Sequence, residues 1–109
     1  MEDRRERKPT HPGELIREDL LAEAGLSQNK LAQLIGVSPK TISDIVNEGR
    51  RITPDLALRL ARVFNSTPEM WLNMQQAVDL WEARNIHKRE YDRIHPIHEP
   101  LAARELHPA

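Results

Sequence analysis

The sequence predicts an all-α fold, and three features support this fold class. The dipeptides Ser38-Pro39, Thr53-Pro54 and Thr67-Pro68 each join a helix-capping side chain to a proline that suits the first helical position. Glycines follow two apolar stretches, where helices commonly end. The apolar residues recur at the spacing of one helical face, and no strand pattern has support before residue 90.

These signals predict five helices in order. The first follows Pro12 and stops at Gly25, and the second is capped by Ser27 and stops at Gly36. We expect the helices over residues 13–24, 28–35, 39–47, 54–64 and 68–84.

The expected domain organisation is a single helical domain between two tails. At 109 residues, the chain has room for one compact domain. We expect a mobile N-terminal arm over residues 1–11, the domain over 12–86 and a C-terminal tail over 87–109. The tail contains four histidines and three prolines, so we expect it to be loosely ordered, with a short extended piece at 92–97.

Composition excludes several classes of protein and site. The chain has no cysteine, so disulfides and thiolate metal sites are excluded. No apolar run approaches the ~20 residues of a membrane-spanning helix. The charged start lacks the apolar stretch of a secretory signal, so we expect a cytoplasmic protein without a membrane partner.

The formal net charge of −1 conceals an uneven distribution. Residues 13–25 hold four acidic side chains and one arginine, whereas residues 27–51 hold four basic and two acidic ones. DNA binding depends on where the charges lie, and this mildly basic middle segment gives only weak support for nucleic-acid binding. The prediction of DNA binding therefore rests on the residue pattern.

Residues 28–47 meet the separate demands of a helix-turn-helix motif. Ala32 provides the small side chain needed where the two helices cross, and Gly36 can adopt the positive φ of the turn. The expected inward anchors are Leu31, Ile35, Val37, Ile42 and Ile45, and the expected outward residues are Lys40, Thr41, Ser43, Asp44 and Asn47. Apolar anchors alone would also suit two helices of an unrelated bundle. The joint fit of Ala32, Gly36 and Val37 favours the helix-turn-helix.

The segment from Leu26 to Ser43 resembles the lambda-repressor-like (XRE) helix-turn-helix family. More narrowly, the chain is similar to the HigA antitoxins, also called the VapI or virulence-associated group. This resemblance covers about residues 11–82 and includes HPGELIRED from His11, VNEGRRITPDLALRLA from Val46, NSTPEMWLNMQ from Asn65 and then Asp79-Leu80.

The resemblance implies a five-helix DNA-binding domain that forms a homodimer and represses its own operon. It also implies a small basic toxin partner of the HigB type, an mRNA-cleaving enzyme that the antitoxin neutralises. The toxin surface could be the charged arm or the acidic first helix. Two alternatives stay open: a stand-alone or phage-type regulator without a toxin, and a protein-interaction module that does not bind DNA.

The candidate DNA-binding residues centre on the third helix. We expect Lys40, Ser43 and Asp44 to contact bases, because lysine can donate to guanine and a carboxylate can accept from cytosine. The alternative for Asp44 is a solvated helix face. We expect phosphate contacts from Ser27, Gln28, Thr41, Asn47, Arg50 and Arg51, with Ser38 and Pro39 completing the candidate surface. The alternative for the arginine pair is ordinary surface charge.

The fifth helix carries an apolar stripe of Trp71, Met74, Val78 and Trp81, widened by Leu72, Ala77 and Leu80. We expect Trp71 to seal the core, and Met74, Val78 and Trp81 to form the dimer interface. The alternative is that the whole stripe is internal. Dimerisation would place two recognition helices ~34 Å apart, the spacing that reads a palindrome.

The sequence predicts neither catalysis nor a cofactor. It contains no Ser-His-Asp order, phosphate-binding glycine loop or HExxH motif. His95 and His98 lie three residues apart in a proline-broken tail, and we interpret them as exposed side chains rather than metal ligands.

Overall fold

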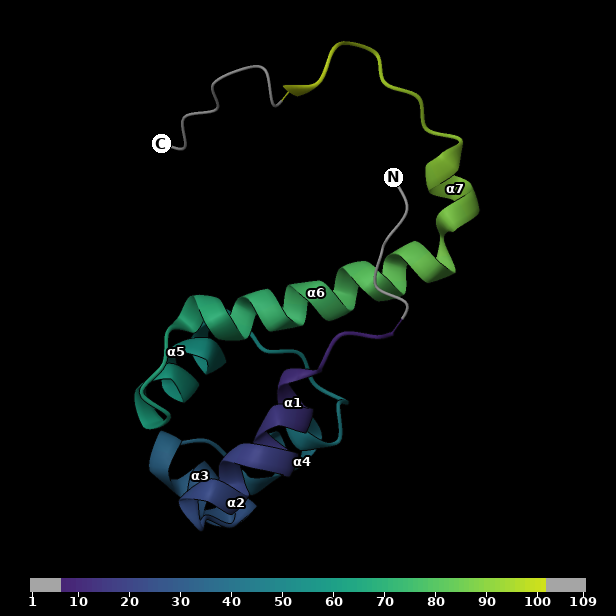
Figure 1. Cartoon of the computed structure of the whole chain (residues 1–109). Coiled ribbons are helices and arrows are strands. Elements are labelled where there is room, and N and C mark those ends of the chain that lie inside the picture. The colour runs from purple at the N-terminus through teal and green to yellow at the C-terminus, as the bar shows by residue number, and fades with distance from the viewer. Residues whose placement is uncertain (1–6, 102–109) are drawn as a thin grey trace.

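The computed structural model describes residues 7–101, and every regular element within this range is helical. The elements are α1 (Pro12–Leu15), the π-helical η1 (Ile16–Leu20), α2 (Leu21–Ala24), α3 (Gln28–Ile35), α4 (Pro39–Val46), α5 (Pro54–Val63), α6 (Pro68–Ile86) and α7 (Lys88–Asp92). Because α1, η1 and α2 follow one another without a break, the first five helical stretches correspond to the five predicted helices (Figure 1). The predicted all-α fold is confirmed.

The predicted caps explain where the helices begin and end. The hydroxyl oxygens of Ser27, Ser38, Thr53 and Thr67 accept hydrogen bonds from the backbone N–H groups three residues later. Gly25 and Gly36 close α2 and α3 with φ angles of 66° and 74°, a conformation that favours glycine. Local sequence therefore sets these boundaries.

The first helical stretch differs from the regular helix that the sequence predicts. It widens into a π-helical turn over Ile16–Leu20, where the Leu21 N–H donates to the carbonyl of Ile16, five residues earlier. Its start also lies earlier than expected, because His11 Nδ1 accepts from the Gly13 N–H at 2.9 Å. His11, which the sequence interpretation assigned to the arm, is 6% exposed and belongs to the folded body.

The core forms where α1, α3, α4 and α5 meet beneath α6, which crosses the body in Figure 1. Trp71 is fully buried there, and its indole N–H donates to Ser66 Oγ at 2.9 Å. The predicted anchors Leu31, Ile42 and Ile45 are also fully buried, and Val37 packs partly buried against them. Thus the two helices of the predicted motif are fixed to the rest of the domain by their apolar faces.

The segment after α6 is more regular than expected. Residues 88–92 form the short helix α7 at the far end of α6, and the Lys88 ammonium lies 3.0 Å from the Asp92 carboxylate (Figure 1). The predicted extended piece at 92–97 therefore begins inside a helix, and it pairs with no strand among the described residues. The ends of the predicted arm and tail, residues 1–6 and 102–109, lie outside the described residues. Within residues 7–101, no helix combines the length and apolar character required to span a bilayer.

Candidate nucleic-acid interface

The turn between α3 and α4 has the geometry that the sequence predicts for a helix-turn-helix. Ala32 is fully buried, and its carbonyl accepts from the Val37 N–H at 3.0 Å. Arg59 of α5 reaches the same turn and donates to the carbonyl of Ile35 at 2.7 Å. The Ile35 carbonyl has no partner within α3, and this hydrogen bond from the Arg59 guanidinium attaches the turn to α5.

The outer face of α4 presents polar side chains to solvent. Ile42, Ile45 and Val46 are buried on its inner face, which leaves the predicted outward residues on the opposite side. The Lys40 side chain is 83% exposed, and its ammonium lies 3.2 Å from the Asp44 carboxylate one turn later. Ser43 and Asn47 form a second pair on this face, with Asn47 Nδ2 at 3.4 Å from Ser43 Oγ. A short, polar, protruding helix of this kind suits a major groove.

The starts of α3 and α4 hold the residues predicted to contact phosphates. Ser27 and Ser38 are exposed, while Gln28 and Thr41 are half-buried. Ser38 Oγ also lies 2.9 Å from Thr41 Oγ1, so these two hydroxyls form one unit at the start of α4. Free amides at a helix start attract anions, and here they add to the exposed hydroxyls.

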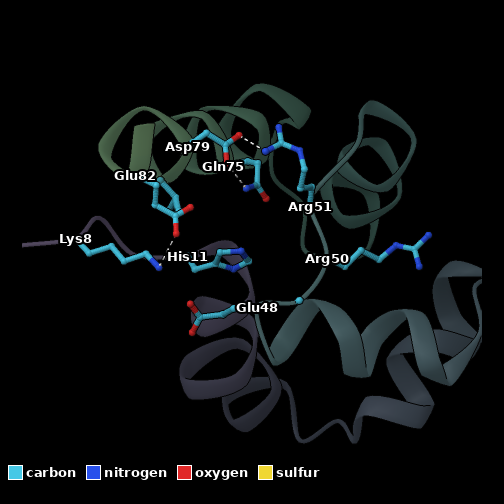
Figure 2. A pocket seen from close by; sticks show the side chains of 10 residues that line it. Lys8, His11, Glu48, Arg50, Arg51, Gln75, Asp79 and Glu82 are labelled. Atoms are coloured by element: carbon cyan, nitrogen blue, oxygen red, sulfur yellow. Dashed lines mark hydrogen bonds and ion pairs between the residues drawn. The ribbon is translucent and has the colours of Figure 1, made fainter. Parts of the chain in front are cut away.

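The two arginines after α4 point in different directions (Figure 2). A pocket beside α6 is lined by residues that include His11, Gln75 and Asp79. The Arg50 side chain is exposed and extends away from this hollow. Arg51 extends toward α6 and forms an ion pair with the Asp79 carboxylate. The predicted phosphate clamp comprises both arginines. The Arg51 side chain is 67% exposed and its guanidinium pairs with Asp79 in the free chain, so a phosphate contact from Arg51 stays a prediction.

The buried face of α6 is rotated relative to the predicted stripe. Trp71, Gln75 and Val78 are buried, whereas Met74 and Trp81 are half-buried and Leu80 is 43% exposed. Val78 is 2% exposed within the single chain and has almost no surface to offer a second chain. Val78 is thus a core residue of the single chain, whereas Met74 and Trp81 keep surface available for the predicted dimer interface.

Sequence reasoning missed the role of Gln75. Its Oε1 accepts from the backbone N–H of Ile52 at 2.9 Å, and its Nε2 donates to Asp79 Oδ1 at 3.1 Å. Gln75 lies four residues after Trp71 and three before Val78, so it occupies a core position of the helix. A polar residue at such a position signals a buried hydrogen bond, and this signal was present in the sequence.

Sequence reasoning also missed His11, which appears only as the first residue of a motif. Burial lowers the pKa of its imidazole below the usual 6.5, and this effect outweighs the nearby Glu48 carboxylate, which raises the pKa. The neutral ring therefore accepts the Gly13 N–H and caps α1. His11 has a structural role, and its position lines the hollow in Figure 2.

The tail histidines do not assemble into a metal site in the part of the chain that the structure describes. His87, His95 and His98 are exposed, and His98 Nδ1 lies 2.7 Å from the carbonyl of Glu99. No group of three or more histidine, aspartate or glutamate side chains gathers as metal ligands within residues 7–101.

Comparison with known proteins supports the same architecture. Residues 16–72 match the family described as helix-turn-helix. The chain is 43% identical over 101 residues to YbaQ of Escherichia coli strain K12, described as an uncharacterized HTH-type transcriptional regulator, covering 91% of this chain and 89% of YbaQ. It is 37% identical over 91 residues to antitoxin HigA-1 of Vibrio cholerae, covering 84% of this chain and 86% of HigA-1.

A solved structure has the same fold and bears on the proposed interface. Pseudomonas aeruginosa antitoxin HigA, solved with the higBA promoter, superimposes with a TM-score of 0.77 at 37% identity and covers 82% of this chain and 98% of HigA. The family match over residues 16–72 contains the whole of α3, α4 and α5 and the start of α6. The chain belongs to the helix-turn-helix family and, within it, to the group of HigA-type antitoxins.

Proposed function

We propose that this chain is the antitoxin of a toxin–antitoxin module and represses its own operon by binding operator DNA as a homodimer. The observation that carries the proposal is the exposed polar face of α4, held out from the core by the turn at Gly36. The P. aeruginosa relative with this fold was solved with a promoter, which supports the same use of the fold here. The proposed site of action is the cytoplasm.

In this arrangement the outer face of α4 enters the major groove. Lys40, Ser43 and Asp44 contact base edges, and the start of α3 with Asn47 and Arg50 contacts the phosphates on either side. Because Asp44 holds the Lys40 ammonium in the free protein, the pair must reorganise when Lys40 meets a guanine. This arrangement favours sequence selection over indiscriminate attraction to phosphate.

The homodimer would use the exposed half of α6. Met74 and Trp81 are half-buried and Leu80 is exposed, so an apolar surface remains available on the helix that covers the core. Replacing Trp81 by Ala should weaken self-association, because an aromatic side chain supplies much of the energy of such a contact. Analytical ultracentrifugation over a range of concentrations measures this, with the exposed Gln76→Ala as a matched control on the same helix.

The toxin partner is proposed to be a small basic protein of the HigB type. The acidic side chains of the first helical stretch, including Glu18 and Asp19, are exposed and complementary to a basic surface. Co-purification from the native host tests this proposal. Recovery of a small basic nuclease supports it, whereas a chain that still represses its promoter but recovers no such protein favours the stand-alone regulator.

DNA binding is tested with the duplex from the region upstream of the chain's own gene. Fluorescence anisotropy at several salt concentrations should show binding that weakens steeply as salt rises. The substitution Lys40→Ala should cost roughly 1–3 kcal/mol of binding free energy and reduce discrimination against a scrambled duplex. Equal, salt-independent signals for both duplexes would contradict DNA binding and favour a protein-interaction module.

A further inference from the structure

We propose that Gln75 and Asp79 of α6 are positioning residues for the loop after α4 and give its two arginines separate roles. Arg50 contacts the DNA backbone, whereas Arg51 is held on α6 and makes no phosphate contact. This inference deepens the proposed function, since it assumes that α4 binds DNA.

Two consecutive loop residues are attached to α6. The backbone N–H of Ile52 donates to Gln75 Oε1 at 2.9 Å, and the Arg51 guanidinium pairs with Asp79. Gln75 then joins the two attachments, because its Nε2 donates to Asp79 Oδ1 at 3.1 Å. Gln75 is 4% exposed, so water competes little for these hydrogen bonds. The path of the loop is consequently set by α6.

This attachment determines where each guanidinium lies. Figure 2 shows Arg51 directed toward Asp79, and Arg50 on the other side of the loop, directed away from α6. Arg50 forms no hydrogen bond or ion pair with any residue in the range 7–101 and is exposed. It follows the end of α4 by four residues, at the point where a phosphate contact would flank the recognition helix.

The carboxylate of Asp79 explains why the two arginines are not equivalent. An ion-paired guanidinium beside a carboxylate contributes little net positive charge to the DNA-facing surface, whereas Arg50 contributes a full charge. Each phosphate that a basic side chain neutralises contributes about 0.9 to the slope of log K against log salt. The salt slope of each arginine variant therefore reports whether that arginine contacts a DNA phosphate. A variant that only lost stability would not show a slope reduced for Arg50 and unchanged for Arg51.

The experiment measures the slope of log K against log salt with the duplex from the region upstream of the chain's own gene. Five proteins are compared: the parent, Arg50→Ala, Arg51→Ala, Asp79→Asn and the double variant Arg51→Ala/Asp79→Asn. For each chain in contact with DNA, Arg50→Ala should reduce the slope by about 0.9, and Arg51→Ala should leave it unchanged. Asp79→Asn releases Arg51 and should steepen the slope by up to about 0.9, and the double variant should return it to the parent value.

A matched control separates this effect from a general change in charge. Asp92→Asn removes a carboxylate that pairs with Lys88 at 3.0 Å on α7, at the far end of α6, and should leave the slope unchanged. If Arg51→Ala lowers the slope as much as Arg50→Ala, or if Asp79→Asn does not steepen it, the inference is wrong while DNA binding stands. If the parent does not bind the duplex, the proposed function fails together with the inference.

Discussion

Gly13 lies directly against the backbone carbonyl of Ile45, so close that a Cβ atom at Gly13 would stand 1.9 Å from the Ile45 oxygen. Gly13 is the second residue of the first helical stretch, and Ile45 is in the last turn of α4. The missing side chain therefore lets α1 approach the recognition helix backbone to backbone. This contact fixes the end of α4 that faces away from its Ser38 cap.

We expect Gly13→Ala to destabilise the protein by on the order of 3 kcal/mol, because the opposing atom is backbone and cannot rotate away. Urea unfolding monitored by circular dichroism measures this. Gly49→Ala is the matched control, since its Cβ would meet only Asp44 O at 3.7 Å, and it should change stability by less than about 1 kcal/mol. Similar midpoints for the two variants would refute the close approach.

Removing the polar end of Gln75 should also destabilise the fold. In Gln75→Leu the backbone N–H of the buried Ile52 loses its acceptor, which costs about 1–3 kcal/mol. The control is the same substitution at the neighbouring, exposed position, Gln76→Leu. It should change the free energy of unfolding by no more than about 0.5 kcal/mol. A Gln75→Leu variant as stable as the parent would show that the hydrogen bond to Ile52 contributes nothing.

The ion pair between Lys40 and Asp44 should control selectivity more than affinity. In Asp44→Asn the Lys40 ammonium is released and a negative charge leaves the DNA-facing surface, so binding to a scrambled duplex should strengthen several-fold. Binding to the specific duplex should strengthen less, because a carboxylate that accepts from cytosine is lost. Competition between the two duplexes measures the ratio, and an unchanged ratio would identify Asp44 as a solvated helix face.

Acid should weaken the fold through His11. Burial depresses the pKa of this imidazole in the folded state below its unfolded value of about 6.5, so the unfolded chain binds the proton more readily. The contribution to stability is complete above about pH 6.5 and is lost as the pH falls from there through the folded-state pKa.

The variant His11→Asn isolates this effect, because asparagine also caps helices but does not titrate. Urea midpoints between pH 7.5 and pH 5 should fall more for the parent than for His11→Asn. Parallel curves would mean that His11 keeps the same pKa in the folded and unfolded chains.

Much of the fold could be predicted because its boundaries depend on local chemistry. A hydroxyl side chain before a proline favours a helix start through local contacts alone, and a glycine such as Gly36 suits a turn with positive φ. The outer face of α4 could be predicted for the same reason, since its inner positions are set by helical period alone.

The remaining features depend on contacts between distant parts of the chain. Gln75 shares a helical face with Trp71 and Val78, but its hydrogen-bond partner, the Ile52 N–H, is set by the position of the 50–52 loop. The partner of Arg51 is 28 residues away, so no local pattern distinguishes it from Arg50. These contacts distinguish Gln75 from Met74 and Arg51 from Arg50.

The π-helical turn at Ile16–Leu20 has a consequence for how this family can vary in length. A π turn accommodates one more residue than an α-helical turn between the same two flanking segments. Deleting one residue there would restore regular helix while Gly13 and Gly25 kept their places at the two ends. Chains of this group that are one residue shorter between those glycines should therefore share the same recognition helix placement, with the length difference absorbed inside the first helical stretch.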